Sequence, residues 1–155
     1  MVLGDLSDRF VNLPVDEVDD AIEGSQRRIC ECLHLDMSLL WQLSPNQPVS
    51  MLLTHKHQPP QFLPFPETLD AREAFPWGLG KTLRGETIVL SRLAEAPTEA
   101  ARDVEGIQLY GGKSVLCFPL SAGGVQPFGA LGFVVAGEER EWTAELVGRL
   151  RTVAQ

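Results

Sequence analysis

The chain has only three cysteines among its 155 residues, and their pattern indicates neither a disulfide framework nor a structural zinc site. Cys30, Cys32 and Cys117 are an odd set, and the first two lie about 200° apart around a helix axis, so they cannot pair with each other. No Cys-x-x-Cys pair is present, which disfavours a structural zinc site of the usual spacing. We therefore expect reduced and mostly buried thiols.

Basic residues and long apolar runs are also scarce. Lys and Arg number 13 against 21 Asp and Glu, and the resulting net charge of -8 opposes the phosphate neutralisation on which nucleic-acid binding depends. Residues 1–5 lack the basic flank of a secretion signal, and the longest apolar stretch, around residues 128–136, is too short to span a bilayer. These features predict a soluble, cytoplasmic protein without membrane or direct nucleic-acid partners.

The composition that is present is that of an ordinary globular protein. Hydrophobic residues make up 44% of the chain and charged residues 22%, which is enough for a packed core. The length suits one domain better than two. We therefore predict a single domain over residues 1–155.

The first half of the sequence predicts helices followed by a hairpin. Apolar residues recur at helical spacing from Leu3 to Leu13 and, after Pro14, from Val18 to about His34, which places N-terminal helices within residues 1–34. Alternation over Met37 to Leu43 and Val49 to His55 predicts two strands joined at the turn cluster 44–48. The proline-rich segment 58–66 is predicted to be a loop of the kind that often covers a site.

The second half alternates helices and strands. Pro76 suits the start of a short helix ending near Gly85, a buried strand follows at residues 87–90, and another helix is predicted over residues 98–109. Residues 114–120 and 128–135 are predicted strands with a glycine-containing turn at 121–124. This order predicts an α+β fold with a central antiparallel sheet of five to six strands flanked by helices.

The last predicted helix lies within residues 142–155. Thr143 is a plausible N-cap, because a threonine hydroxyl can accept a backbone N–H of the first turn. The apolar positions are spaced approximately as a heptad seam of about two repeats. They are Trp142, Leu146, Leu150 and Val153.

Two motifs give the sequence a family resemblance. After the helix that ends at Gly111, a strand closes with Phe118-Pro119-Leu120, and the next strand reads Gly-Ala-Leu-Gly-Phe over residues 129–133. This ordered set resembles the second half of GAF domains, especially those of bacterial regulators. The first half agrees in outline, through the strand at 38–41, the segment 53–55 and Phe75-Pro76-Trp77.

The resemblance implies a GAF/PAS-like fold and a non-enzymatic sensory module of bacterial signal transduction. Such domains bind a small molecule, often dimerise through their first and last helices, and stand before an output domain such as a two-component histidine kinase or a transcription activator. The resemblance thus implies a homodimer within a longer regulator, of which this chain is a fragment. The ligand and any cofactor stay unknown.

The family places its pocket on one face of the sheet, beneath the central helices and the long loop. Aromatic walls with few polar groups suit a small organic ligand, while each of these side chains could instead simply fill the core. The candidate ligand-binding residues implied here are Trp41, Leu53, His55, Phe75, Trp77, Cys117 and Phe133.

Other chemistry finds weaker support. Residues 78–82 resemble part of a phosphate loop, but Phe75 stands where that motif needs glycine. His55 and His57, with His34, form the only credible metal constellation, and no acidic or cysteine ligand is tied to them by spacing. We therefore assign no metal site.

No catalytic set is predicted either. Asp103 and its acidic neighbour Glu105 are interpreted as solvated surface, and no serine has a histidine at an interpretable spacing. GAF domains that reduce methionine sulfoxide place several cysteines at the pocket, whereas Cys30 and Cys32 belong to an early helix here. Bilin-carrying relatives attach their chromophore to a cysteine commonly followed by histidine, a pair this chain lacks.

Two alternatives to a ligand sensor stay open. One is a GAF domain that binds nothing and serves as a dimerisation spacer between signalling modules. The other is a redox or metal sensor that uses Cys117 or the pair His55 and His57.

Overall fold

The computed structural model describes residues 15–44, 50–121 and 127–154. Three predicted features lie outside these residues: the helix between Leu3 and Leu13, most of the turn cluster at 44–48, and the glycines of the turn at 121–124.

The centre of the fold is a six-stranded antiparallel sheet with the strand order β3-β2-β1-β6-β5-β4. The predicted α+β class with its central antiparallel sheet is confirmed. The strands are β1 (Met37–Leu43), β2 (Ser50–His57), β3 (Thr68–Asp70), β4 (Ile88–Leu90), β5 (Gly112–Leu120) and β6 (Gly129–Ala136).

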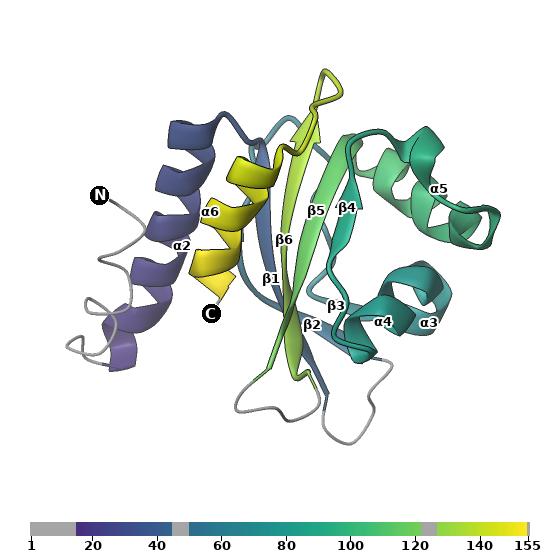
Figure 1. Ribbon diagram of the computed structural model, residues 1–155. Helices are drawn as coiled ribbons and strands as arrows, with labels where there is room; N and C mark the ends of the chain where they lie inside the picture. Colours follow the sequence, from purple (N-terminus) through teal and green to yellow (C-terminus); the bar gives the residue numbers. More distant parts are fainter. Residues whose placement is uncertain (1–14, 45–49, 122–126, 155) are drawn as a thin grey trace.

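Helices cover both faces of the sheet (Figure 1). The terminal helices α2 (Val15–Leu33) and α6 (Ala144–Ala154) pack on one face, which we call the terminal-helix face. The short helices α3 (Ala71–Ala74), α4 (Pro76–Leu83) and α5 (Ala101–Leu109) lie over the opposite face, which we call the cavity face. None of the described helices is both long and apolar enough to cross a membrane.

Strand pleating divides the apolar residues between the two faces. Alternate residues of a strand point to opposite sides, so Leu116 and Phe118 of β5 face α2 and α6 while Val115 and Cys117 face the cavity. The same holds for Phe133 against Gly132 and Val134 of β6. The sheet therefore separates two apolar layers, one beneath α2 and α6 and the other on the cavity face.

Helix α2 ends at a left-handed residue. His34 has a φ of 58°, and the Leu35 N–H donates to the Cys30 carbonyl at 2.8 Å, a helix-ending pattern in which glycine is the usual residue. On its inner side, the buried Gln26 donates through Nε2 to the Ser38 hydroxyl at 3.2 Å. The bond from Gln26 to Ser38 joins α2 to β1.

Helix α6 starts at the predicted cap, since the Leu146 N–H donates to the Thr143 hydroxyl at 3.2 Å. Trp142, Leu146 and Leu150 are buried against the sheet, and Val153 packs beside them. The heptad-like seam of the sequence therefore faces the chain's own sheet. The spacing is ambiguous in the sequence because a helix packed on a sheet and a coiled-coil helix both need an apolar stripe.

Arg140 joins the ends of these two helices. Its guanidinium donates to the carbonyls of Leu33 and His34, the second at 3.0 Å, and its backbone N–H donates to the Ser114 hydroxyl at 2.7 Å. The C-terminal end of α2 is thereby bound to the segment that leads into α6.

Two short elements escaped sequence prediction. Strand β3 and helix α3 occupy residues 68–74, a segment without periodicity because three or four residues are too few to display a pattern. Between β4 and α5, two 3₁₀ turns follow at Leu93–Glu95 and Thr98–Ala100, so the helix predicted from residue 98 becomes α-helical at Ala101.

Candidate ligand cavity

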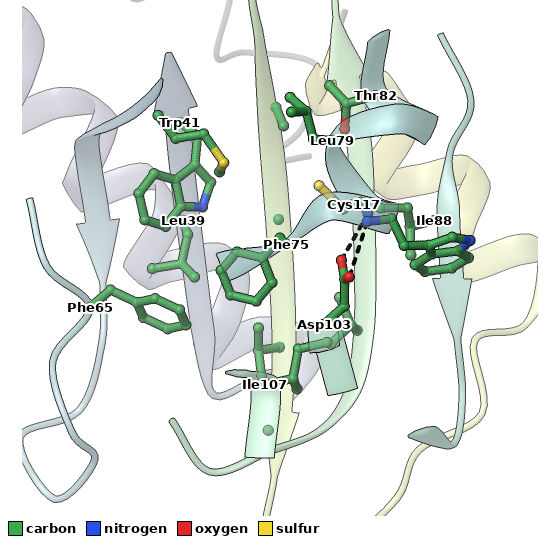
Figure 2. A pocket seen from close by; sticks show the side chains of 18 of the residues that line it. Leu39, Trp41, Phe65, Phe75, Leu79, Thr82, Ile88, Asp103, Ile107 and Cys117 are labelled. Atoms are coloured by element: carbon green, nitrogen blue, oxygen red, sulfur yellow. Dashed lines mark hydrogen bonds between the residues drawn. The ribbon is translucent and has the colours of Figure 1, made fainter. Parts of the chain in front are cut away.

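A cavity of about 110 Å³ lies between the sheet and the helices of the cavity face (Figure 2). Strands β1, β2, β4, β5 and β6 form its floor, and α4, α5 and Phe65 from the loop after β2 form its walls. The lining is apolar except at a few positions. Its members include Leu39, Trp41, Phe65, Phe75, Trp77, Leu79, Thr82, Ile88, Leu90, Asp103, Ile107, Cys117, Ala130 and Gly132.

The cavity exists because the middle of its floor carries small side chains. Gly132 of β6 is paired with Cys117 of β5, and Ala130 follows two residues away on the same face. A Cβ atom placed at Gly132 would meet no atom closer than the Leu39 carbonyl oxygen at 3.8 Å. Close packing is normal in protein interiors, so this space needs larger neighbours to hold it open.

Aromatic side chains provide that frame. The Phe65 ring stacks on Tyr110 with centroids 3.9 Å apart and meets Trp41 edge to face at 5.9 Å. Gln58 holds the loop that carries Phe65, because its amide donates to the Leu63 carbonyl at 2.8 Å and accepts the Phe65 N–H at 3.4 Å. Of residues 58–66, for which the sequence left open a cover over a site or a plain connection, Phe65 lines the cavity.

Asp103 caps α4 from the neighbouring helix. Its two carboxylate oxygens accept the N–H groups of Trp77 and Gly78 at 3.1 and 2.8 Å, shown as dashed lines in Figure 2. Phe75 and Pro76 begin α4 without any side-chain cap of their own, so Asp103 satisfies donors that the helix start leaves free. The carboxylate also opposes the positive end of the helix dipole.

Asp103 is buried, with 3% of its surface exposed, which corrects its interpretation as solvated surface. Burial raises the pKa of its carboxyl, and the hydrogen bonds from Gly78 and Trp77 offset only part of that rise. A sequence signal for this burial was present, because Ala100, Asp103 and Ile107 share one stripe of α5 at helical spacing.

The raised pKa of Asp103 predicts a pH-dependent stability. Between the ordinary value of ~4 and the raised value, the folded chain binds more protons than the unfolded chain, so the free energy of unfolding falls as pH rises through that window. Urea unfolding from pH 4 to 7 should show this fall as a difference between the unaltered chain and Asp103→Asn. A difference that is flat, or that grows with pH, would contradict the assignment.

The Cys117 thiol in the cavity has low nucleophilic reactivity. Burial raises the pKa of the Cys117 thiol to about 12, so it stays protonated at neutral pH. Burial also raises the pKa of Cys30, on the terminal-helix face, to about 12, with Asp36 and Glu31 adding to the effect. Cys32 is exposed on α2. All three thiols are free.

The structure brings together four of the seven predicted ligand-binding residues. Trp41, Phe75, Trp77 and Cys117 all line the cavity. Phe133 is buried on the terminal-helix face, where it meets Phe118 edge to face with centroids 6.5 Å apart. Phe133 follows Gly132 directly, and adjacent strand residues point to opposite faces.

Leu53 and His55 line a separate hollow beside α2. A bulge in the pairing of β1 with β2 places Leu40 opposite His55 but Trp41 opposite Leu53. The extra residue turns His55 to the terminal-helix face, where its Nε2 lies 2.8 Å from a carboxylate oxygen of Asp19. Among the described residues, no group of three or more His, Cys, Asp or Glu is arranged to hold a metal ion.

Most of the residues that line the cavity were not among the sequence candidates, and they include Asp103, Thr82 and Phe65. Thr82 belongs to α4, so residues 78–82 form part of a helix where a phosphate loop would need an open turn. Lys81 lies over the Trp77 ring, with Nζ 5.1 Å from its centroid. Phe65 lies in a loop, where no periodicity indicates which residues point inward.

Comparison with known proteins identifies the architecture. No family model and no curated protein matches the chain. Among solved structures, the phycocyanobilin-bound GAF domain of a cyanobacterial phytochrome superposes with a TM-score of 0.76 at 15% identity, covering 99% of this chain and 87% of that one. The chain has the GAF-domain fold.

Other GAF domains are similar to the same extent. The PixJ GAF domain of Thermosynechococcus elongatus in its blue-light absorbing form gives a TM-score of 0.70 at 15% identity, covering 92% of this chain and 84% of that one. The GAF domain of an Acinetobacter phosphoenolpyruvate-protein phosphotransferase gives 0.69 at 13% identity, with 99% and 86% covered. The resemblance seen in residues 109–133 is thus confirmed for the fold.

Proposed function

We propose that residues 1–155 form a cytoplasmic, non-enzymatic GAF sensory domain that binds a small molecule in the cavity and passes the signal through α6 to an output domain of a bacterial regulator. The single observation that carries this proposal is the aromatic-framed cavity on the sheet face opposite the terminal helices. Apolar cavities with a few polar groups are the usual form of small-molecule sites.

The size of the cavity favours a ligand of about one ring. Its volume of about 110 Å³ is close to the ~150 Å³ of an engineered cavity that binds benzene, and below the ~300 to 1,000 Å³ typical of drug-sized ligands. The protonated Cys117 thiol is also a poor nucleophile for attaching a tetrapyrrole. Both points favour a small, non-covalent ligand over a bilin for this chain.

A hydrogen bond joins strand β4, which lines the cavity, to Trp142 just before α6. Leu90 of β4 lines the cavity, and its carbonyl accepts the indole N–H of Trp142 at 3.0 Å. The Trp142 backbone N–H donates to the Ser91 hydroxyl, also at 3.0 Å. Because α6 begins two residues after Trp142, a ligand that shifts β4 would shift the start of α6.

Homodimer formation belongs to this proposal as well. The apolar side of α6 is buried within the chain, so a partner copy would contact the outer faces of α2 and α6. Exposed residues such as Arg27, Cys32 and Arg149 lie there. The coupled output would be a two-component histidine kinase or a transcription activator.

Filling the cavity tests the function. Replacing Gly132 with valine should leave the fold intact, since a Cβ there meets only ordinary contacts, while the added methyl groups occupy the space of the ligand. We expect a saturable rise in melting temperature for the unaltered chain with one-ring aromatics such as phenol, aniline, benzyl alcohol and indole, and at least a roughly tenfold loss of affinity in Gly132→Val.

The matched control is Gly148→Ala on the exposed side of α6, where nothing lies within 4 Å of the added Cβ atom. This change should raise helix stability without altering ligand binding. If no member of a broad small-molecule library shifts the unaltered chain, the sensor proposal fails and the dimerisation spacer takes its place. If Gly132→Val binds as well as the unaltered chain, the ligand lies elsewhere.

A further inference from the structure

The charge in the cavity is carried by one side chain. Among the described residues that line it, Asp103 alone is charged, and it forms no ion pair within the described part of the chain. Each carboxylate oxygen accepts one backbone N–H, from Trp77 or Gly78, and an ionised carboxylate has about four acceptor positions. Acceptor capacity therefore remains beside an apolar space.

A second polar side chain in the lining is that of Thr82. Thr82 is buried, with 6% of the residue exposed, and it belongs to the face of α4 that borders the cavity. Figure 2 shows the Thr82 oxygen directed toward the cavity that Asp103 borders. The Thr82 hydroxyl is not one of the fully buried side-chain atoms without a partner among the described residues, which fits an oxygen that borders the cavity and can bind a polar group of a molecule inside it.

Helix geometry sets the spacing of these two groups. Gly78, whose N–H binds Asp103, and Thr82 are four residues apart on α4, which is about one helical turn or ~6 Å along the axis. Residues four apart lie on the same side of a helix. A substituted benzene ring has about the length of one helical turn, so it suits a cavity that Asp103 borders near Gly78 and that Thr82 borders one turn later on α4. Apolar residues such as Leu79 and Ile88 complete this part of the lining.

We propose that the cavity selects a one-ring aromatic amine that also carries a hydroxyl group, with its ammonium bound to Asp103 and its hydroxyl bound to Thr82. This inference rests on the proposed function, since it assumes that the cavity is the ligand site. An ammonium would neutralise a buried carboxylate that has no ion pair among the described residues, and the aromatic side chains of Phe65, Phe75 and Trp41 in the lining suit the ring of the ligand. A carboxylate ligand would be repelled.

Four molecules of nearly equal size test this chemistry on the unaltered chain. 4-Hydroxybenzylamine carries both groups, benzylamine lacks the hydroxyl, 4-hydroxybenzyl alcohol replaces the ammonium with a neutral group, and 4-hydroxybenzoate is an anion. By calorimetric titration at pH 7 we expect 4-hydroxybenzylamine to bind best, about tenfold or more tighter than the neutral alcohol, with the anion weakest.

Two variants assign the contacts. Asp103→Asn should weaken 4-hydroxybenzylamine by about tenfold or more while leaving 4-hydroxybenzyl alcohol within about threefold, because only the amine loses a charge partner. Thr82→Val, which keeps the side-chain shape, should reduce the affinity for 4-hydroxybenzylamine to that for benzylamine. Circular dichroism checks that each variant remains folded, and the four-ligand comparison holds even where a variant does not fold.

The outcomes separate this inference from the proposed function. If the neutral alcohol or the anion binds as tightly as the amine, and Gly132→Val abolishes that binding, the cavity is a ligand site but its proposed selectivity is wrong. If none of the four molecules binds and the wider aromatic panel also gives no shift, both proposals fail. Preference for the amine that persists in Asp103→Asn would also overturn the assignment of Asp103.

Discussion

Replacement of Gly129 by alanine is expected to lower the free energy of unfolding by about 3 kcal/mol. An added Cβ atom would lie 2.3 Å from the Trp41 carbonyl oxygen and 3.5 Å from the Gln42 Cα atom. These are backbone atoms, so no side chain can rotate away to make room. Strands β1 and β6 would have to separate at the end of their ladder, where Gln42 pairs with Gly129.

The same strand offers a matched control for this change. Gly132→Ala adds one methyl group at a position where the nearest atom is 3.8 Å away, so it should be neutral or stabilising by about 0.4 to 1 kcal/mol through the unfolded state. Chemical denaturation of both variants gives the comparison. Equal stabilities for Gly129→Ala and Gly132→Ala would mean that β6 does not approach β1 as closely as described.

Truncation of Trp142 to alanine is expected to cost about 3 to 5 kcal/mol, the range for large aromatic residues in cores. Trp142 is 6% exposed and packs in the cluster between the sheet and α6. Trp142→Phe keeps most of the packing and removes the indole N–H, leaving the buried Leu90 carbonyl without that donor. Its cost should be about 1 to 3 kcal/mol. Denaturant unfolding measures both values.

Trp142→Phe also tests the coupling of the cavity to α6. With the aromatic compound that shifts the unaltered chain most, ligand binding should change amide hydrogen exchange in α6, and this change should shrink in Trp142→Phe while affinity stays within about threefold. Gly148→Ala, on the exposed side of α6, serves as the control for a change in α6 that leaves the bond between Trp142 and Leu90 intact. An undiminished response of α6 in Trp142→Phe would show that the signal does not pass through this bond.

The long elements of the fold were predictable from sequence because each carries a local signal. Helix α2, the alternating strand at Met37–Leu43, the short helix beginning at Pro76 and the cap at Thr143 all occur as predicted. Gly85 and Gly111 end their elements with φ angles of 76° and 87°, a conformation that favours glycine. The spacing of apolar residues, together with Gly, Pro and capping residues at the ends of elements, is enough to predict an element whose structure is determined by its own segment of the chain.

The cavity was only partly predictable, because its composition depends on register between strands. Strict alternation along β2 puts Leu53 and His55 on one face. The bulge opposite Leu40 and Trp41 instead leaves Leu53 packed with Trp41 on the cavity face and turns His55 toward Asp19 of α2. The family position of Phe133 predicts a place in the cavity, and the pleat puts Gly132 there instead. A bulge arises between two strands and leaves no mark in either sequence alone.

Asp103 illustrates a second limit of sequence reasoning. An acidic residue between charged neighbours is usually solvated, and its cap on α4 joins residues 25 and 26 positions apart in the chain. Only the spacing of Asp103 to Ile107 on α5 indicates an inward direction. Which donors the carboxylate meets is decided by the packing of α5 against α4.

The contacts of Arg140 couple the position of the C-terminal end of α2 to that of the segment before α6. Because its guanidinium holds the last carbonyls of α2 while its backbone is bound to Ser114 of β5, neither helix end can slide along the sheet without the other unless these hydrogen bonds break. Bonds from a cation to carbonyls at a helix C-terminus are favourable for the helix dipole as well. A rotation of α2 would therefore displace the segment that leads into α6. A change in the tilt of α6 would likewise displace the last turn of α2.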